Sequence, residues 1–110
     1  LHGPDTADLA TPGSEALTFT TSGTTTGPKL VLHRQRSLAT HAATLASRLE
    51  LAPGAAALIP VPLCGTFGLT LALAALAGGA AIHAPERFDA MESDATIRRA
   101  RITHTLGGDD

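Results

Sequence analysis

A long stretch without any Asp, Glu, Lys or Arg separates Glu50 from Glu86, and it limits the possible folds more than any other feature. It is long enough to cross a bilayer, which takes about 20 apolar residues. Pro53, Pro60, Pro62 and several glycines interrupt it, however, and its longest helix-compatible run covers only residues 68–77. We therefore expect one buried helix and buried strands here, and no membrane span.

Short β-prone runs alternate with helical patterns along most of the chain. Residues 1–15 read as an irregular lead-in, and residues 17–32 as a strand–loop–strand hairpin. Helices and strands alternate over residues 37–106. With the strand at residues 30–32 they give the order βαβαβαβ, which predicts an α/β fold with a mainly parallel sheet and helices on its faces. The predicted strands cover residues 17–21, 30–32, 56–60, 80–83 and 102–106, and the predicted helices cover residues 37–51, 68–77 and 89–101.

The three predicted helices differ in where their apolar side chains lie. The first carries one apolar stripe, formed by Leu38, Ala42, Leu45 and Leu49. The helix over residues 68–77 has leucine and alanine on every side, so we expect it to be buried all round. Such a helix needs neighbours on all sides, supplied by further chain or by self-association.

Composition excludes several classes of function. The net charge is −2, from 8 basic and 10 acidic side chains, so a surface for nucleic acid is not expected. The five histidines have no metal-ligand spacing, and the single cysteine rules out a disulfide framework. The first 15 residues hold acidic side chains and no apolar core, which argues against a signal peptide and favours a cytoplasmic location.

The loop from Thr21 to Lys29 carries the sharpest chemical signal. Its hydroxyl side chains, its turn-forming glycines and its single ammonium group together describe a cradle for an anion, and a nucleotide triphosphate is the expected ligand. The candidate phosphate-binding residues are Thr21, Ser22, Gly23, Thr24, Thr25, Thr26, Gly27 and Lys29.

This loop is not a Walker loop, because three residues rather than four separate its glycines, and Pro28 precedes Lys29. The alternative reading is a flexible, hydroxyl-rich turn without a ligand. A proline and a lysine at the entry to a β-prone run favour the anion cradle.

The loop resembles the phosphate loop of the adenylate-forming superfamily, in which the pattern is Thr-Ser-Gly-Ser/Thr-Thr-Gly-x-Pro-Lys-Gly. That superfamily includes acyl-CoA synthetases, the adenylation domains of peptide synthetases, and luciferases. Thr26 stands where a glycine is usual, and Leu30 replaces the last glycine. The resemblance implies that this chain is part of a larger N-terminal AMP-binding domain.

Further segments resemble the same superfamily more loosely, so that the likeness runs from Leu17 to Gly108. Residues 32–33 and 103–104 are similar to two of its histidine-containing segments, and residues 61–69 to its Pro-Leu-x-His-x-x-Gly segment, which lines the acyl pocket. Gly65 stands where acyl-CoA synthetases often have histidine. The implied pocket residues are Cys64, Gly65, Thr66, Phe67 and Gly68.

What the resemblance implies is an ATP-dependent acid–thiol ligase. A carboxylate attacks the α-phosphorus of ATP, usually with Mg²⁺, and releases pyrophosphate. A thiol, often that of coenzyme A, then takes the acyl group. The superfamily's adenine-side segment, ribose-binding aspartate and catalytic lysine have no counterpart in these residues, so we expect the 110 residues alone to be inactive and to hold no catalytic residue.

Some alternatives stay open at this point. Cys64 is either a small wall residue or a thiol that faces the substrate. The arginines at positions 98, 99 and 101 form either a solvated helix end or a phosphate site, and the former is favoured. The chain as a whole could instead be a non-catalytic α/β module for nucleotide binding or oligomerisation. The sequence names neither the acid nor the thiol.

Overall fold

The computed structural model describes residues 10–20 and 27–107, and the chain divides into two compact units, one up to Thr40 and one from His41. The first unit holds strands β1 (Glu15–Thr20) and β2 (Leu30–Arg34) and the start of helix α2 (Gln35–Arg48). The second holds the end of α2 and the elements that follow: β3 (Ala56–Leu58), α3 (Thr66–Gly78), β4 (Ala81–His83), α4 (Ala90–Arg99) and β5 (His104–Thr105).

An antiparallel hairpin forms the first unit, as predicted. Phe19 of β1 pairs with Val31 of β2, and the Phe19 ring meets the ring of His33 edge-on, with centroids 5.6 Å apart. The other face of the hairpin exposes Leu30 and Leu32. The turn before β1 is tied to the start of α2, since the amide of Gln35 donates to the carbonyl of Ser14 at 2.9 Å.

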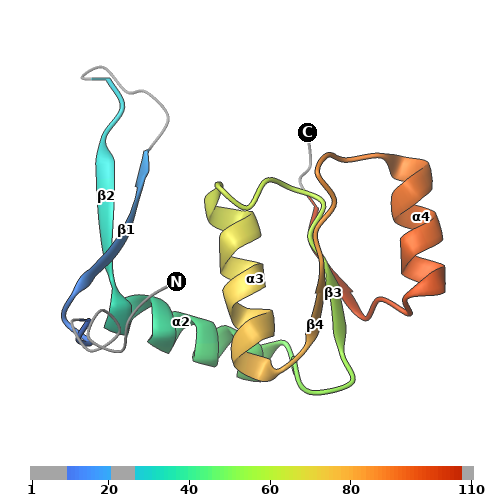
Figure 1. Ribbon diagram of the computed structural model, residues 1–110, viewed down its shortest axis with the longest axis horizontal. Helices are drawn as coiled ribbons and strands as arrows, with labels where there is room; N and C mark the ends of the chain where they lie inside the picture. Colours follow the sequence, from blue (N-terminus) through green and yellow to red (C-terminus); the bar gives the residue numbers. More distant parts are fainter. Residues whose placement is uncertain (1–9, 21–26, 108–110) are drawn as a thin grey trace, which may run out of the picture. The chain divides into compact units, whose positions relative to one another are not determined.

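A three-stranded parallel sheet with the order β4-β3-β5 forms the second unit. The chain moves from β3 through α3 to β4 on one side, and then through α4 to β5 on the other side. Right-handed crossovers in opposite directions put the two helices on opposite faces of the sheet, and Figure 1 shows this arrangement.

The predicted element order is confirmed, with two corrections. The strand at residues 30–34 pairs with β1 and not with the parallel sheet, so that sheet has three strands among the described residues. Helix α3 is not buried all round. It buries the side that meets β3 and β4, while Leu76 is 65% exposed, because no described segment covers its outer side.

The core lies between α3 and the sheet and is built from small side chains. Ala57 and Ile59 from the β3 segment and Ala74 and Ala75 from α3 are completely buried. Alanine lets the backbones approach closely. The closest approach is at Gly78, where an added Cβ would lie 2.7 Å from the carbonyl carbon of Leu51.

The three helices of the described residues end in the same way, with a residue in the left-handed conformation. Gly79 ends α3 with φ 78°, whereas Glu50 and Arg101 fill the corresponding positions after α2 and α4 with φ 56° and 52°. Each is followed by an amide that bonds back five residues, as from Leu51 to the carbonyl of Ala46 at 2.9 Å. Helix α2 therefore ends at Arg48, three residues before the end of the predicted range of residues 37–51.

Candidate functional site

The carboxyl ends of the parallel strands meet at one edge of the second unit. From β3 the chain first goes to one neighbouring strand and then to the other, so the direction of winding reverses between β3 and β5. In open α/β sheets, ligands bind in the crevice at such a reversal, outside the carboxyl ends of the strands. The fold therefore indicates where to look for a site.

An open cavity of about 1070 Å³ lies at this edge. Its walls come from the segment after β3, the first turn of α3, the loop after β4 and the end of β5. The residues that line it are Pro60, Val61, Pro62, Cys64, Gly65, Thr66, Phe67, Gly68, Phe88, Leu106 and Gly107. We call it the strand-edge cavity.

All five residues predicted for the acyl pocket, from Cys64 to Gly68, line the strand-edge cavity. A tight turn brings them there, in which the amide of Gly65 donates to the carbonyl of Pro62 at 3.1 Å. Helix α3 then starts at Thr66, and no side chain caps its N-terminus. The free thiol of Cys64 is exposed, which is consistent with either reading of this residue.

Four lining residues escaped the sequence analysis. Pro60 directly precedes the predicted segment, whereas Phe88, Leu106 and Gly107 come from other parts of the chain. They follow β4 and β5 and are distant in sequence from the turn at Gly65. The signal that could have found them is topological, because the ends of neighbouring parallel strands lie at one edge.

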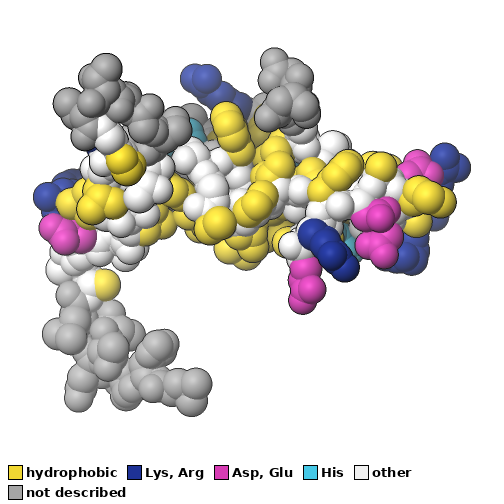
Figure 2. Space-filling model, turned by 90° about the horizontal axis from the view of Figure 1, so that it is seen from above, with side chains coloured by type: hydrophobic (Ala, Val, Ile, Leu, Met, Phe, Trp, Pro, Cys, Tyr) yellow, Lys and Arg dark blue, Asp and Glu magenta, His cyan; other side chains and the backbone are white. Residues whose placement is uncertain are grey.

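The strand-edge cavity carries no charged side chain among the residues described around it. Phe67 is 78% exposed and Phe88 is 64% exposed, so neither ring is used by the core. Figure 2 shows hydrophobic side chains gathered over α3 and the sheet, while charged side chains crowd toward α4. Large apolar side chains left in the open at a strand edge are typical of a surface that receives a ligand or partner.

The predicted phosphate loop belongs to the other unit, and most of it, Thr21 to Thr26, lies outside the described residues. Gly27 has φ 89°, and nothing lies within 4 Å of the position of a Cβ, so its backbone conformation alone accounts for the glycine. Lys29 is exposed just before β2 begins. The role of this loop stays a prediction.

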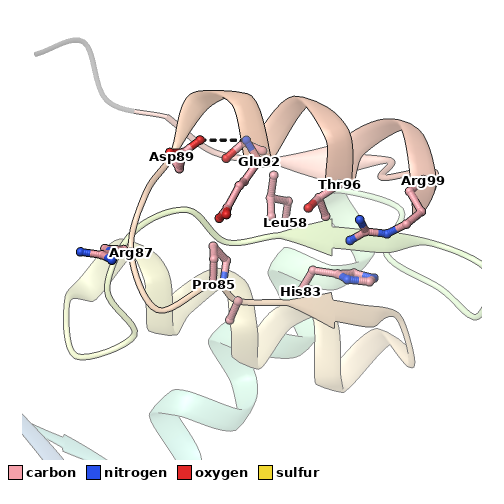
Figure 3. A pocket seen from close by; sticks show the side chains of 10 residues that line it. Leu58, His83, Pro85, Arg87, Asp89, Glu92, Thr96 and Arg99 are labelled. Carbon is pink, nitrogen blue, oxygen red and sulfur yellow. Dashed lines mark hydrogen bonds between the residues drawn. The ribbon is translucent and has the colours of Figure 1, made fainter.

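A smaller cavity of about 220 Å³ lies between β4 and α4. Figure 3 shows Glu92, Thr96 and Arg99 extending from α4 toward the strands. The carboxylate of Asp89 accepts a hydrogen bond from the amide of Glu92 at 2.9 Å and so caps the helix. The charged lining of this smaller cavity differs from the apolar wall of the strand-edge cavity.

The arginines near the end of α4 have separate surroundings. Arg98 pairs with Asp94 one turn earlier at 3.2 Å, with both side chains well exposed, which agrees with a solvated helix end. Arg99 instead lines the smaller cavity. Among the described residues, no group of three or more His, Cys, Asp or Glu side chains could hold a metal ion.

His104 has a structural position at the opposite edge of the sheet. Its Nε2 donates to the carbonyl of Leu49, and its Nδ1 lies 2.7 Å from the hydroxyl of Thr103. That hydroxyl also accepts from the amide of Ala56 at 3.0 Å. These hydrogen bonds link the start of β5 to β3 and to the end of α2.

Comparison with known proteins identifies the chain's relatives. The sequence pattern of a family described as AMP-binding enzyme matches residues 3–107. No curated protein sequence matches the chain.

No described helix has the length and apolar content needed to cross a membrane.

Several solved structures share the fold. O-succinylbenzoate CoA synthetase from Bacillus subtilis in complex with the acyl-adenylate intermediate OSB-AMP superposes with a TM-score of 0.80 at 25% identity, over 87% of this chain and 25% of that one. The same enzyme with ATP and magnesium ion gives 0.80 at 25% identity, over 87% and 20%. The inhibitor-bound N-terminal domain of FACL13 from Mycobacterium tuberculosis gives 0.78 at 26% identity, over 86% and 24%. The chain thus spans about a quarter or less of these proteins.

Proposed function

The chain belongs to the AMP-binding enzyme family, and from this premise we propose that it is part of an ATP-dependent acid–thiol ligase. Such an enzyme activates a carboxylic acid as an acyl-adenylate and passes the acyl group to a thiol. We take coenzyme A as the thiol, since CoA synthetases are among the structures that this chain resembles.

One observation carries this proposal, namely the strand-edge cavity at the reversal of winding in the sheet. The five residues that the family resemblance assigns to the acyl pocket all line it. Residues chosen by motif and a cavity found by geometry are independent, so their agreement supports a role in holding the acid. In this proposal the segment Cys64–Gly68 forms part of the acyl wall.

The loop Thr21–Lys29 would hold the phosphates of ATP. Attack of the carboxylate on the α-phosphorus forms an oxygen–phosphorus bond, and pyrophosphate leaves with the electron pair of the broken bond. Negative charge grows on the departing phosphates. Hydroxyls, amides and the ammonium group of this loop would stabilise that charge, with Lys29 on the β- or γ-phosphate. Mg²⁺ would bind together with ATP and offset the negative charge of its phosphates.

Calorimetric titration with Mg–ATP tests the proposal on the chain as it stands. We expect the wild type to bind and the Lys29→Ala variant to bind about tenfold or more weakly, since a charge-assisted hydrogen bond contributes about 1.5–3 kcal/mol. Lys29→Arg keeps the charge and should bind at an intermediate strength. Arg36→Ala, which removes an exposed cation near the same hairpin, is the matched control and should bind like the wild type.

Three outcomes would each contradict part of this account. The absence of heat with the wild type would remove the nucleotide from the proposal. Equal affinities for the wild type and Lys29→Ala would remove Lys29 from the phosphate site. Pyrophosphate release by these 110 residues with any acid would overturn our expectation that they are inactive alone.

A catalytic assay, rather than a binding assay, distinguishes the ligase from the alternative of a non-catalytic α/β module. The chain would be joined to the rest of a family enzyme. The module predicts that this protein binds Mg–ATP but shows no acid-dependent exchange of pyrophosphate into ATP. Self-association, which the uncharged middle of the chain suggested, gains no support from the structure or the relatives. A cytoplasmic location likewise remains a prediction.

A further inference from the structure

We propose that Gly65 determines which acids the strand-edge cavity accepts. Its missing side chain leaves room for a bulky, uncharged, apolar tail of a monocarboxylic acid. This inference rests on the proposed function, because it takes the cavity to be the acid's site.

The two glycines of the cavity wall have different reasons to be glycine. A Cβ on Gly68 would overlap the carbonyl oxygen of Pro62 and lie 3.2 Å from Cγ2 of Val61. Gly68 is therefore required by the close approach of α3 to the preceding segment. At Gly65 the nearest heavy atom to an added Cβ is the same oxygen, but at 3.5 Å, which is ordinary van der Waals contact.

The backbone of Gly65 does not require glycine either. Its φ of −94° and ψ of 159° lie in the extended region that any residue adopts. Since neither packing nor conformation excludes a side chain, the effect of glycine here is on the cavity that it lines. A larger residue at position 65 would take up space in the cavity without disturbing the turn.

The strand-edge cavity has room for a bulky ligand. Ligand pockets usually measure about 300–1,000 Å³. The strand-edge cavity is open to solvent on one side, and its volume of about 1070 Å³ slightly exceeds that range. A short acid such as acetate would leave most of this wall uncovered.

The lining indicates an uncharged tail. No charged side chain lines this wall among the described residues, so a second carboxylate would lose its hydration there without gaining a partner. The exposed rings of Phe67 and Phe88 offer apolar surface instead. An aliphatic or aromatic tail would cover both and remove that surface from water.

Cys64 provides a readout that needs no catalysis. It is the only cysteine of the chain, it is exposed, and it lines the cavity beside Gly65. An acid that occupies the cavity should slow alkylation of this thiol by iodoacetamide. The probes are 4-phenylbutanoate and octanoate, with octanedioate and acetate as the dicarboxylate and short comparators.

We expect 4-phenylbutanoate and octanoate to slow alkylation about tenfold when present at about ten times their dissociation constants. Octanedioate and acetate should not slow it. Gly65→Leu should abolish the protection by both bulky acids while its thermal unfolding stays like that of the wild type. Gly13→Leu is the matched control, because Gly13 lies in the other unit and an added Cβ there is 4.0 Å from its nearest neighbour.

Retained protection in Gly65→Leu, equal protection by octanedioate, or no protection by any acid would overturn the inference. If Mg–ATP binds through Lys29 in the same preparation, only the assignment of Gly65 fails and the phosphate-loop proposal stands. If bulky acids protect Cys64 but Mg–ATP does not bind, the proposed selectivity of the cavity is supported, and the proposal that the chain is part of a ligase is contradicted.

Discussion

The two faces of the three-stranded sheet are packed in opposite ways. Helix α3 lies so close to its neighbours that Ala74 and Ala75 are completely buried and Gly78 has no room for a side chain. Helix α4 has no buried residue, and a cavity of about 220 Å³ separates it from β4. One sheet therefore supports a tightly packed helix on one face and a loosely packed helix on the other.

Side-chain type explains the difference. Helix α3 meets the strands with alanine, leucine and glycine, which need no hydrogen-bond partner and allow close approach. Helix α4 places Ser93 and Thr96 on the cavity side, above the buried Leu58. Polar side chains of this size neither fill the space nor bury much apolar area, so the α4 face stays open.

The largest change in stability is expected from a substitution on the face of the sheet that packs against α3. Gly78→Val should lower the free energy of unfolding by about 3 kcal/mol, because the added carbons would collide with the backbone of Leu51. Chemical denaturation would measure the change. The matched control is Leu76→Val on the exposed side of the same helix, which should cost about 0.5 kcal/mol or less. Equal losses at both positions would show that the close approach at Gly78 is not a constraint.

The ends of the two helices offer the next test. Gly79→Ala should lower the free energy of unfolding by about 1–2 kcal/mol, since φ is positive there. Arg101→Gly at the end of α4 should raise it by about 1 kcal/mol for the same reason. Arg101→Ala, which removes the charge and keeps the unfavourable conformation, is the control and should give no gain. A gain from alanine equal to that from glycine would assign the effect to charge.

Enlarging a side chain should have opposite signs on the two faces. Thr96→Leu, directed into the cavity beside α4, should raise the free energy of unfolding by about 0.5–1 kcal/mol. Ala72→Leu on the packed face should lower it by about 1–3 kcal/mol. Thermal unfolding of both variants would make the comparison, and a loss from Thr96→Leu would mean that the α4 face is already filled.

The smallest effect is expected at the surface of α4. Arg98→Ala should change the free energy of unfolding by about 0.5 kcal/mol or less, because the ion pair with Asp94 is exposed and screened by water. Asp89→Ala on the same helix removes the cap and should cost about 1 kcal/mol. A larger loss from Arg98→Ala than from Asp89→Ala would mean that the Asp89 cap does not stabilise the start of α4.

Local patterns made the order of elements predictable, because apolar runs bounded by Pro and Gly mark buried strands. The exposed side of α3 was not predictable, since burial of Leu76 depends on which segments cover it. The end of α2 was missed because Glu50 adopts a conformation usually left to glycine. At the candidate site, the motif predicted Cys64 to Gly68 as pocket residues, and these line the cavity, while Phe88 and Leu106 required knowledge of which strand ends meet.

The most direct test of the proposed ligase is ³¹P nuclear magnetic resonance of Mg–ATP during titration with the chain. The account predicts that the β- and γ-phosphate resonances shift in a saturable way and more than the α resonance, and that Lys29→Ala removes most of this shift. Unchanged phosphate resonances with the wild type, or equal shifts with Lys29→Ala, would contradict it.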